Sequence, residues 1–173
     1  MVNTSALDKQ AAPGSLEDVR QLLNSWLIPN ETRVAEDRFE AYADERTVPT
    51  EHRPPLRQLR DELRPVVGNA TGIDDVLNAW MEIVAVRPHV VDGSVTYRHA
   101  GGLAGELVAA TLSAVASGQW QRLKACPDCR WVFYDHTRNG SKRWCLMTAG
   151  GPEGRSCGSI AKVSAYRRRA RIK

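Results

Sequence analysis

Apolar residues recur every three or four positions through the first part of the chain, which is the spacing of one helical face. The first such stripe opens at Ser15, in a capping-box-like arrangement with Asp18, and stops before Pro29. A weaker stripe, with Val34 and Phe39, follows it. Four helices are therefore expected, at residues 16–26, 33–45, 54–63 and 74–80.

The period changes in the segment EIVAVRPHVVDGSVTYRHA, where Asp92-Gly93 lies between two runs rich in β-branched residues. Both positions of this dipeptide favour the positive φ angles of a tight turn, so a β-hairpin is expected there. The following segment, LAGELVAATLSAVA, returns to helical spacing, and Gly118 is a suitable helix end.

These elements predict a mainly α (α+β) fold. Residues 15–119 form a helical N-terminal domain with one β-hairpin, called the body below, and residues 120–173 form a small C-terminal module. Residues 1–14 read as a flexible polar tail. The body shows no arrangement of residues typical of catalysis and no phosphate-binding glycine loop, so we expect no enzymatic activity.

The chain has 173 residues and is 42% hydrophobic, so it can bury a core without disulfides. No apolar run reaches the ~18 residues of a transmembrane helix. The N-terminus lacks the basic-then-apolar pattern of an export signal, so we expect a cytoplasmic protein without a membrane partner. In that reducing compartment, cysteines indicate metal binding or catalysis before disulfides.

All four cysteines lie in the module, with the spacing C-x2-C-x15-C-x11-C. Two thiols on a tight turn can bind one ion, and a second pair completes a tetrahedral thiolate site. After the first pair, alternating residues predict a strand, Asn139-Gly140 predicts a hairpin turn, and residues 142–144 return toward the ion. The expected order is knuckle, hairpin and helix around one structural Zn²⁺, with the ligands Cys126, Cys129, Cys145 and Cys157.

Three other uses of the cysteines fit the sequence less well. A redox CxxC normally opens a helix after a strand, whereas here a proline-containing turn leads into a strand. Structural disulfides do not suit a reducing compartment. Free buried thiols do not explain why all four cysteines gather in one short segment, so zinc is preferred.

The segments RLKACPDCRWVFYDHTRNGSKRWC and CGSIAKVSAYRRRAR resemble the CGNR zinc-finger family, named for a Cys-Gly-Asn-Arg signature. The resemblance is strongest over residues 120–169 and implies that the four cysteines are zinc ligands. It continues more weakly over residues 15–119, where it implies an ABATE domain of stress-induced transcription regulators. Two departures stand out: the signature reads Cys157-Gly158-Ser159-Ile160, and the spacer LMTAGGPEGRS is longer than usual.

Charge is distributed unevenly along the chain. The net charge is +4, but residues 122–173 carry +10 and residues 1–121 carry −6. The tail AKVSAYRRRARIK predicts a helix with a narrow stripe of Ile160, Val163, Tyr166 and Ala170, which we expect to dock onto the zinc module. Arginines in this helix suit phosphate or guanine, although some of them could merely offset the charge of four thiolates. The expected DNA contacts are Arg138, Lys142, Arg143, Lys162, Arg167, Arg168, Arg169 and Arg171.

The leading hypothesis is a DNA-binding transcriptional regulator, associated with the nucleoid, whose body senses a small effector or forms a homodimer. The alternative is a protein-interaction adaptor in which zinc stabilises the module and the basic tail binds an acidic partner. Binding to DNA discriminates between the two hypotheses.

Overall fold

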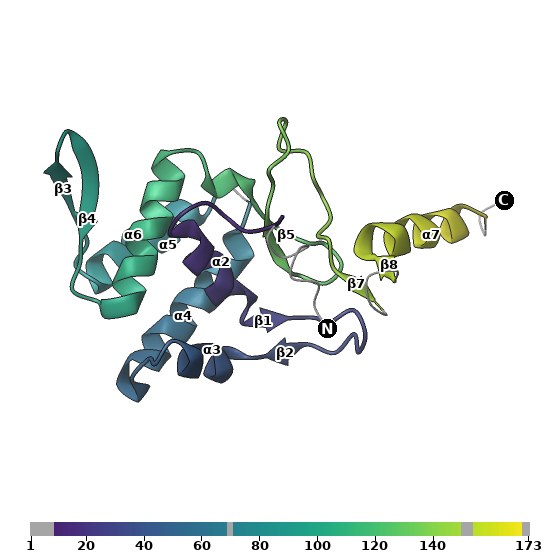
Figure 1. Cartoon of the computed structure of the whole chain (residues 1–173), viewed down its shortest axis with the longest axis horizontal. Helices are drawn as coiled ribbons and strands as arrows, with labels where there is room; N and C mark the ends of the chain where they lie inside the picture. Colours follow the sequence, from purple (N-terminus) through teal and green to yellow (C-terminus); the bar gives the residue numbers. More distant parts are fainter. Residues whose placement is uncertain (1–8, 69–70, 150–153, 171–173) are drawn as a thin grey trace.

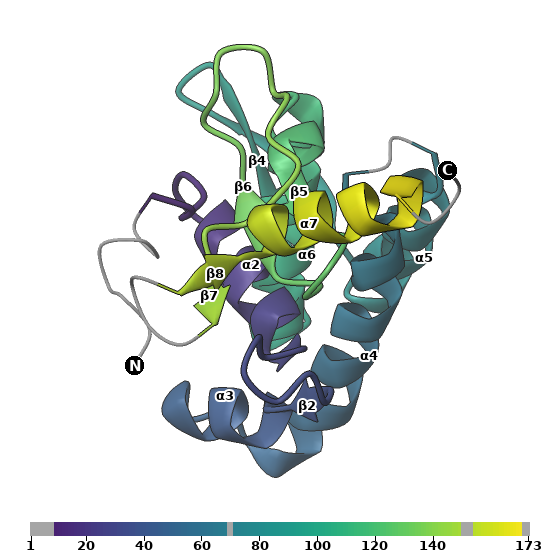
Figure 2. The ribbon, with the colours of Figure 1, turned by 90° about the vertical axis from the view of Figure 1, so that its right-hand side faces the viewer.

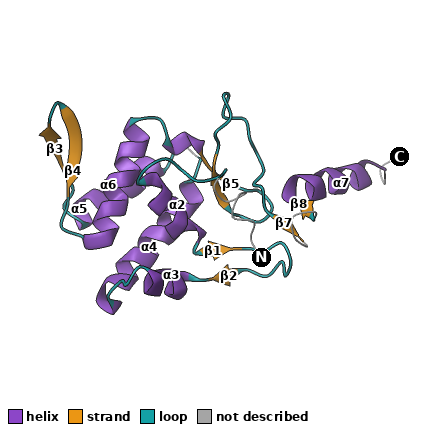
Figure 3. Ribbon diagram, viewed as in Figure 1, coloured by secondary structure: helices purple, strands orange, loops and turns teal. Residues whose placement is uncertain are grey.

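The structure is a computed structural model that describes residues 9–68, 71–149 and 154–170. Helices dominate the body, and small strand pairs lie between and beyond them (Figures 1 and 3). The body helices are α2 (Leu16–Asn24), α3 (Phe39–Glu45), α4 (Arg53–Leu63), α5 (Ile73–Ile83) and α6 (Gly102–Ala116).

The helices pack around one hydrophobic core, in which α2, α4 and α6 contact one another. Leu22, Leu59 and Val108 are fully buried there, and so is the ring of Trp80 on α5. The Trp80 indole N–H donates to Glu62 at 2.7 Å, which satisfies its polar group. The predicted helical spacing therefore identifies the core face of the body.

Three details of the predicted helices are wrong. The first helix ends at Asn24, and Trp26, expected at its end, lies in a strand. The stretch expected to be helical from residue 33 begins its helix only at α3, because Arg33 has a left-handed φ of 57° and β1 (Trp26–Leu27) pairs with β2 (Glu36–Asp37). Val34, expected on the apolar stripe, is 65% exposed. At the start of α2, Ser15 makes no side-chain cap hydrogen bond, so the capping box is not formed.

The predicted hairpin is confirmed. Strands β3 (Arg87–Val91) and β4 (Ser94–Arg98) are antiparallel, and Asp92 and Gly93 have the positive φ angles of 49° and 74° that the turn requires. The hairpin extends from the end of the body that lies farthest from the C-terminal helix (Figure 1).

The module begins with a hairpin of β5 (Leu123–Ala125) and β6 (Val132–Tyr134), followed by β7 (Thr148–Ala149), β8 (Arg155–Ser156) and α7 (Cys157–Ala170). Trp120, Leu123, Val132 and Tyr134 belong to the same core as the body helices. Helix α7, in contrast, projects away from the body (Figures 1 and 2). The predicted mainly α fold with a four-cysteine module is confirmed.

Candidate metal centre

The β5–β6 hairpin carries the first cysteine pair at its tip, in a turn from Cys126 to Arg130 that we call the knuckle. The Cys126 amide donates to the Trp131 carbonyl at 2.9 Å, and the Arg130 amide donates to the Cys126 carbonyl at 3.0 Å. Arg130 has a left-handed φ of 62°, which lets the chain leave the turn and enter β6. The knuckle thus fixes two sulfurs on one side of the hairpin.

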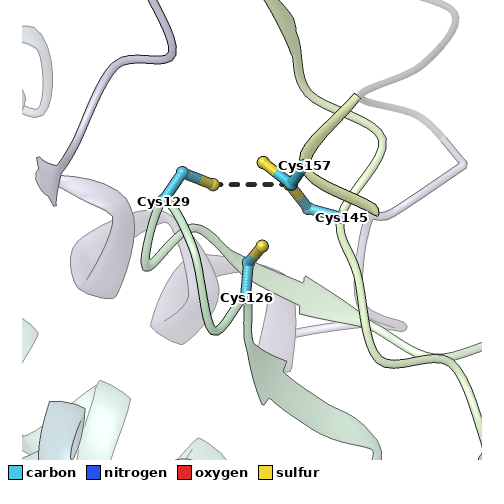
Figure 4. A group of neighbouring side chains, drawn as sticks. All are labelled: Cys126, Cys129, Cys145 and Cys157. Carbon is cyan, nitrogen blue, oxygen red and sulfur yellow. Dashed lines mark hydrogen bonds between the residues drawn. The ribbon is translucent and has the colours of Figure 1, made fainter. Parts of the chain in front are cut away.

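The second pair comes from two later segments. Cys145 lies in the loop before β7, and Cys157 is the first residue of α7. All four cysteines are buried, and their sulfur atoms converge on one point, within 4.8 Å of one another (Figure 4). The Cys129 sulfur is 3.4 Å from that of Cys145, which is 3.7 Å from that of Cys157. These separations suit Zn²⁺, because Zn–S bonds of about 2.3 Å place tetrahedral sulfurs about 3.8 Å apart.

The sulfurs also need a cation. Sulfur hydrogen bonds from Cys129, Cys145 and Cys157 lower the pKa of Cys126, whereas sulfur contacts with Cys126, Cys129 and Cys157 raise the pKa of Cys145. A thiolate in this cluster is therefore stabilised by neighbouring thiols that keep their protons, and four thiolates together repel one another and require a bound metal ion. A site closed by four protein ligands leaves no position for water, so its role is structural.

A comparison with known families agrees with this geometry. The sequence from residue 122 to residue 170 matches the profile of the CGNR zinc finger. Residues 122–170 are a CGNR zinc finger. The four cysteines are its zinc site, as predicted, and the match does not extend into residues 15–119. No curated protein matches the chain.

One feature of the zinc finger differs from its prediction. Asn139-Gly140 does lie in a turn, in which the Gly140 amide donates to the Thr137 carbonyl at 3.1 Å. Residues 142–144, however, form no strand with β6. One edge of β6 pairs with β5, and on the other edge the Tyr134 amide donates to the Gln10 carbonyl at 2.9 Å while Asn24 bonds the backbone of Val132. Residues 136–143 instead form a loop, called the basic loop below.

Asp135 and Lys124 hold this basic loop in place. The Asp135 side chain is fully buried and accepts hydrogen bonds from Lys124 Nζ at 2.9 Å, the Lys142 amide at 2.7 Å and the Thr137 hydroxyl at 2.6 Å. Lys124 Nζ also donates to the Gly140 and Lys142 carbonyls. Burial alone would raise the pKa of Asp135, but the hydrogen bonds from Thr137 and Lys124 hold it well below its usual range.

We expect Asp135→Asn to lower the free energy of unfolding by roughly 2–3 kcal/mol at pH 7, because Lys124 loses its anionic partner. The carboxylate contributes its stability above its unfolded pKa of about 3.9 and loses it as the pH falls below that value. The difference between Asp135→Asn and the wild type should therefore be the same at pH 6 and pH 8 in urea titrations of the zinc-loaded proteins. A difference that changes between these two pH values would show that Asp135 titrates there and is not the fixed anion of the loop.

The predicted DNA-contact residues lie on two segments of the zinc finger. Arg138 and Arg143 are exposed on the basic loop, where the Arg143 guanidinium lies over the Trp144 ring at 5.4 Å. Lys142 is half-buried, with its ammonium 5.4 Å from the Phe133 ring. Arg171 falls outside the described residues. Four of the residues are exposed on α7: Lys162, Arg167, Arg168 and Arg169.

The apolar stripe of α7 does not dock onto the zinc module as a whole: of its four residues, only Ile160 lies on the docked side. Val163 is 43% exposed and Tyr166 is 70% exposed. The docked side of α7 lies instead against the knuckle and Trp144, across a shallow groove lined by Pro127, Asp128, Trp144, Ile160, Ala161, Ala165 and Arg168. A Cβ on Gly158 would lie 3.3 Å from the Trp144 ring, so the small residues, and not the apolar stripe, allow the close approach.

Sequence reasoning missed the part of the metal centre that comes from outside the module. The buried Asn30 side chain lies 3.3 Å from the Cys157 sulfur, and Arg33 binds both carboxylate oxygens of Asp128 in the knuckle, at 2.6 and 3.1 Å. Gln10 is fully buried and accepts a hydrogen bond from the Leu146 amide at 2.9 Å. These residues are more than 90 positions from their partners, and no local pattern marks them.

Proposed function

We propose that this protein is a DNA-binding transcriptional regulator in which the zinc finger contacts duplex DNA through α7 and the basic loop. The observation that carries the proposal is the contrast between paired and unpaired cations. Seven arginines of the body are each held by a carboxylate within 3 Å: Arg20, Arg33, Arg38, Arg46, Arg53, Arg57 and Arg60. Arg64, Arg87 and Arg98 form no ion pair among the described residues of the body.

In the zinc finger, Lys124 pairs with Asp135, but the cations that follow it lack such partners. Among the described residues, none from Arg130 to Arg169 forms an ion pair with a carboxylate. The positive charge that is not paired within the protein therefore lies mainly on the zinc finger, whose helix α7 forms one end of the molecule (Figure 1). A surface of unpaired cations favours a polyanion, whose counterions are released on binding.

The arginines of α7 are also too far from the zinc site to serve as its counterions. Arg167 is ten residues after Cys157, so it lies about 15 Å farther along the helix. The site has closer sources of positive potential, because Cys157 is at the N-terminus of α7 and Arg33 is near Cys157 and Cys129. The charge of Arg167–Arg169 thus remains available to a partner.

The outward side of α7 suits a groove of DNA. At 100° per residue, Tyr166 and Val163 point away from the docked side, with Arg169 and Arg167 at the two edges of this exposed face. A major groove about 12 Å wide accepts a helix whose edges meet the two phosphate backbones. Because the Asn-Arg of the family signature is Ser159-Ile160 here, we expect a weak sequence preference.

The body would supply sensing or dimerisation, as an ABATE-like domain. A cavity of about 490 Å³ between α2, α3 and the zinc finger is a suitable effector site. Tyr42 and Trp131 line it, and the Tyr42 hydroxyl and the Trp131 indole N–H have no hydrogen-bond partner among the described residues. Burial raises the pKa of Tyr42 to about 12, so its hydroxyl is a neutral donor at pH 7. The proposal includes no catalytic activity.

The test is fluorescence anisotropy of labelled duplex DNA with the zinc-loaded full chain over a range of salt concentrations. Binding that weakens steeply with salt supports the proposal. If DNA does not bind even at low salt, the better function is the adaptor, which would bind an acidic protein through the same surface.

Among the described residues, no helix has the length and apolar character needed to cross a membrane.

A further inference from the structure

The zinc site is in contact with a segment more than 100 positions away in the sequence. Residues 28–36 run from the end of β1 into β2, and Ile28, Asn30 and Arg33 of this segment contact the knuckle or the start of α7. The Ile28 amide donates to the Cys129 carbonyl at 3.1 Å, which places this segment beside one zinc ligand. Asn30 and Arg33 then reach the metal centre with their side chains.

In the zinc-loaded protein, the donor and acceptor atoms of the Asn30 side chain can be assigned in only one way. Arg33 has donors only, and its Nη1 lies 3.1 Å from Asn30 Oδ1, so this oxygen is the acceptor. The Asn30 Nδ2 lies 3.3 Å from the Cys157 sulfur, and the thiolate form of Cys157 can only accept. The Asn30 Oδ1 is also 3.4 Å from this sulfur, but that contact requires a thiol proton, which a zinc ligand has lost.

Arg33 links Asn30 to the knuckle and so supports the contact between Asn30 and Cys157. Its two nitrogens bind Asp128, which lies between the two cysteines of the knuckle, and its positive charge lies near Cys157 and Cys129. Hydrogen bonds and charge at metal-bound thiolates reduce the electron density on sulfur and fix the ligand's orientation. Asn30 is only 6% exposed, so water does not readily replace its amide.

We propose that Asn30 and Arg33 are positioning residues of the zinc site, through which the body controls the retention of zinc and the orientation of α7. Asn30 holds the Cys157 thiolate at the first residue of the helix, and Arg33 holds Asn30 and the knuckle together. A change in the 28–36 segment is thereby transmitted to the cationic helix. This inference depends on the zinc site alone and not on the binding of DNA.

The test measures zinc release from the full chain to a colorimetric chelator, with Asn30→Ala and Arg33→Ala as variants. Losing a hydrogen bond to a metal ligand usually weakens metal affinity about 10–100-fold, so we expect zinc release to be faster by up to about this factor in Asn30→Ala. Asn30→Asp should release zinc faster still, because it places a carboxylate beside a thiolate. Asn24→Ala is a matched control: Asn24 also joins the body to the module, through Val132 at 2.7 and 2.8 Å, but bonds no sulfur.

A spectroscopic readout separates positioning from general stability. In cobalt-substituted protein, loss of the hydrogen bond should shift the sulfur-to-metal charge-transfer band to lower energy in Asn30→Ala, with no shift in Asn24→Ala. Circular dichroism confirms that both variants remain folded. If Asn30→Ala and Asn24→Ala release zinc at the same rate and have the same band, Asn30 serves only to join the body to the module, and the proposal is overturned.

Discussion

Removal of zinc is expected to unfold α7 and the knuckle while the helices of the body remain folded. The cluster around the metal contains few apolar side chains besides the cysteines: Phe133 is buried, and Trp131, Trp144 and Met147 are half-buried. Structural zinc contributes ~10–16 kcal/mol of apparent binding free energy in small zinc peptides, and so little apolar area cannot replace it. The β5–β6 hairpin should persist, because Leu123 and Val132 lie in the core of the body.

Hydrogen exchange after chelation measures this result segment by segment. Amides of residues 157–170 should lose protection, whereas those of α4 and α6 should keep it, and far-UV circular dichroism should fall by about the content of one helix. Elemental analysis of the fresh protein should give one zinc per chain, and Cys145→Ser should reproduce the effect of chelation without a chelator. A metal-free protein that keeps α7 protected, or a fresh protein with less than about half an equivalent of zinc, would contradict the role assigned to the four cysteines.

The sequence was informative where local chemistry determines structure. Helical spacing located Leu22, Leu59 and the other core residues, because the period of an amphipathic helix follows from its geometry. The turn at Asp92-Gly93 followed from positive φ preferences, and the zinc ligands followed from thiol spacing.

The sequence was uninformative where tertiary contacts determine strand pairing and helix docking. The strand partner of β6 is β5, which precedes the knuckle, and the expected return of residues 142–144 does not pair with it. The stripe containing Val163 and Tyr166 has the pattern of a buried helix face, but both residues are exposed. The side of α7 that packs against Trp144 and the knuckle carries Gly158 and Ala161, whose small size allows the closer contact. The approach of Asn30 to Cys157 depends on the whole fold, and no spacing rule predicts it.

Replacement of both Arg167 and Arg169 by alanine is expected to flatten the salt dependence of DNA binding. If the wild type neutralises about four to six phosphates, the logarithm of its binding constant should fall with the logarithm of salt concentration at a slope of roughly −4 to −5. Each phosphate contact contributes about 0.9 to this slope, so the double variant should lose nearly two units. Arg168→Ala should have a smaller effect, because Arg168 lines the groove between α7 and the knuckle.

The comparison requires variants that change charge without changing the fold. Arg57→Ala is the matched control, since Arg57 is bound to Asp37 and Glu40 at 2.8 and 2.6 Å and is not available to phosphate. Its slope should equal that of the wild type, while the zinc content and circular dichroism of all the variants stay unchanged. Arg57→Ala removes one positive charge and the double variant removes two, so a loss of affinity in Arg57→Ala about half that of the double variant would indicate a nonspecific effect of net charge. If the double variant has the slope of the wild type, α7 does not contact the phosphates of DNA. The basic loop, with Arg138 and Arg143, would then be the remaining candidate for the DNA-binding surface.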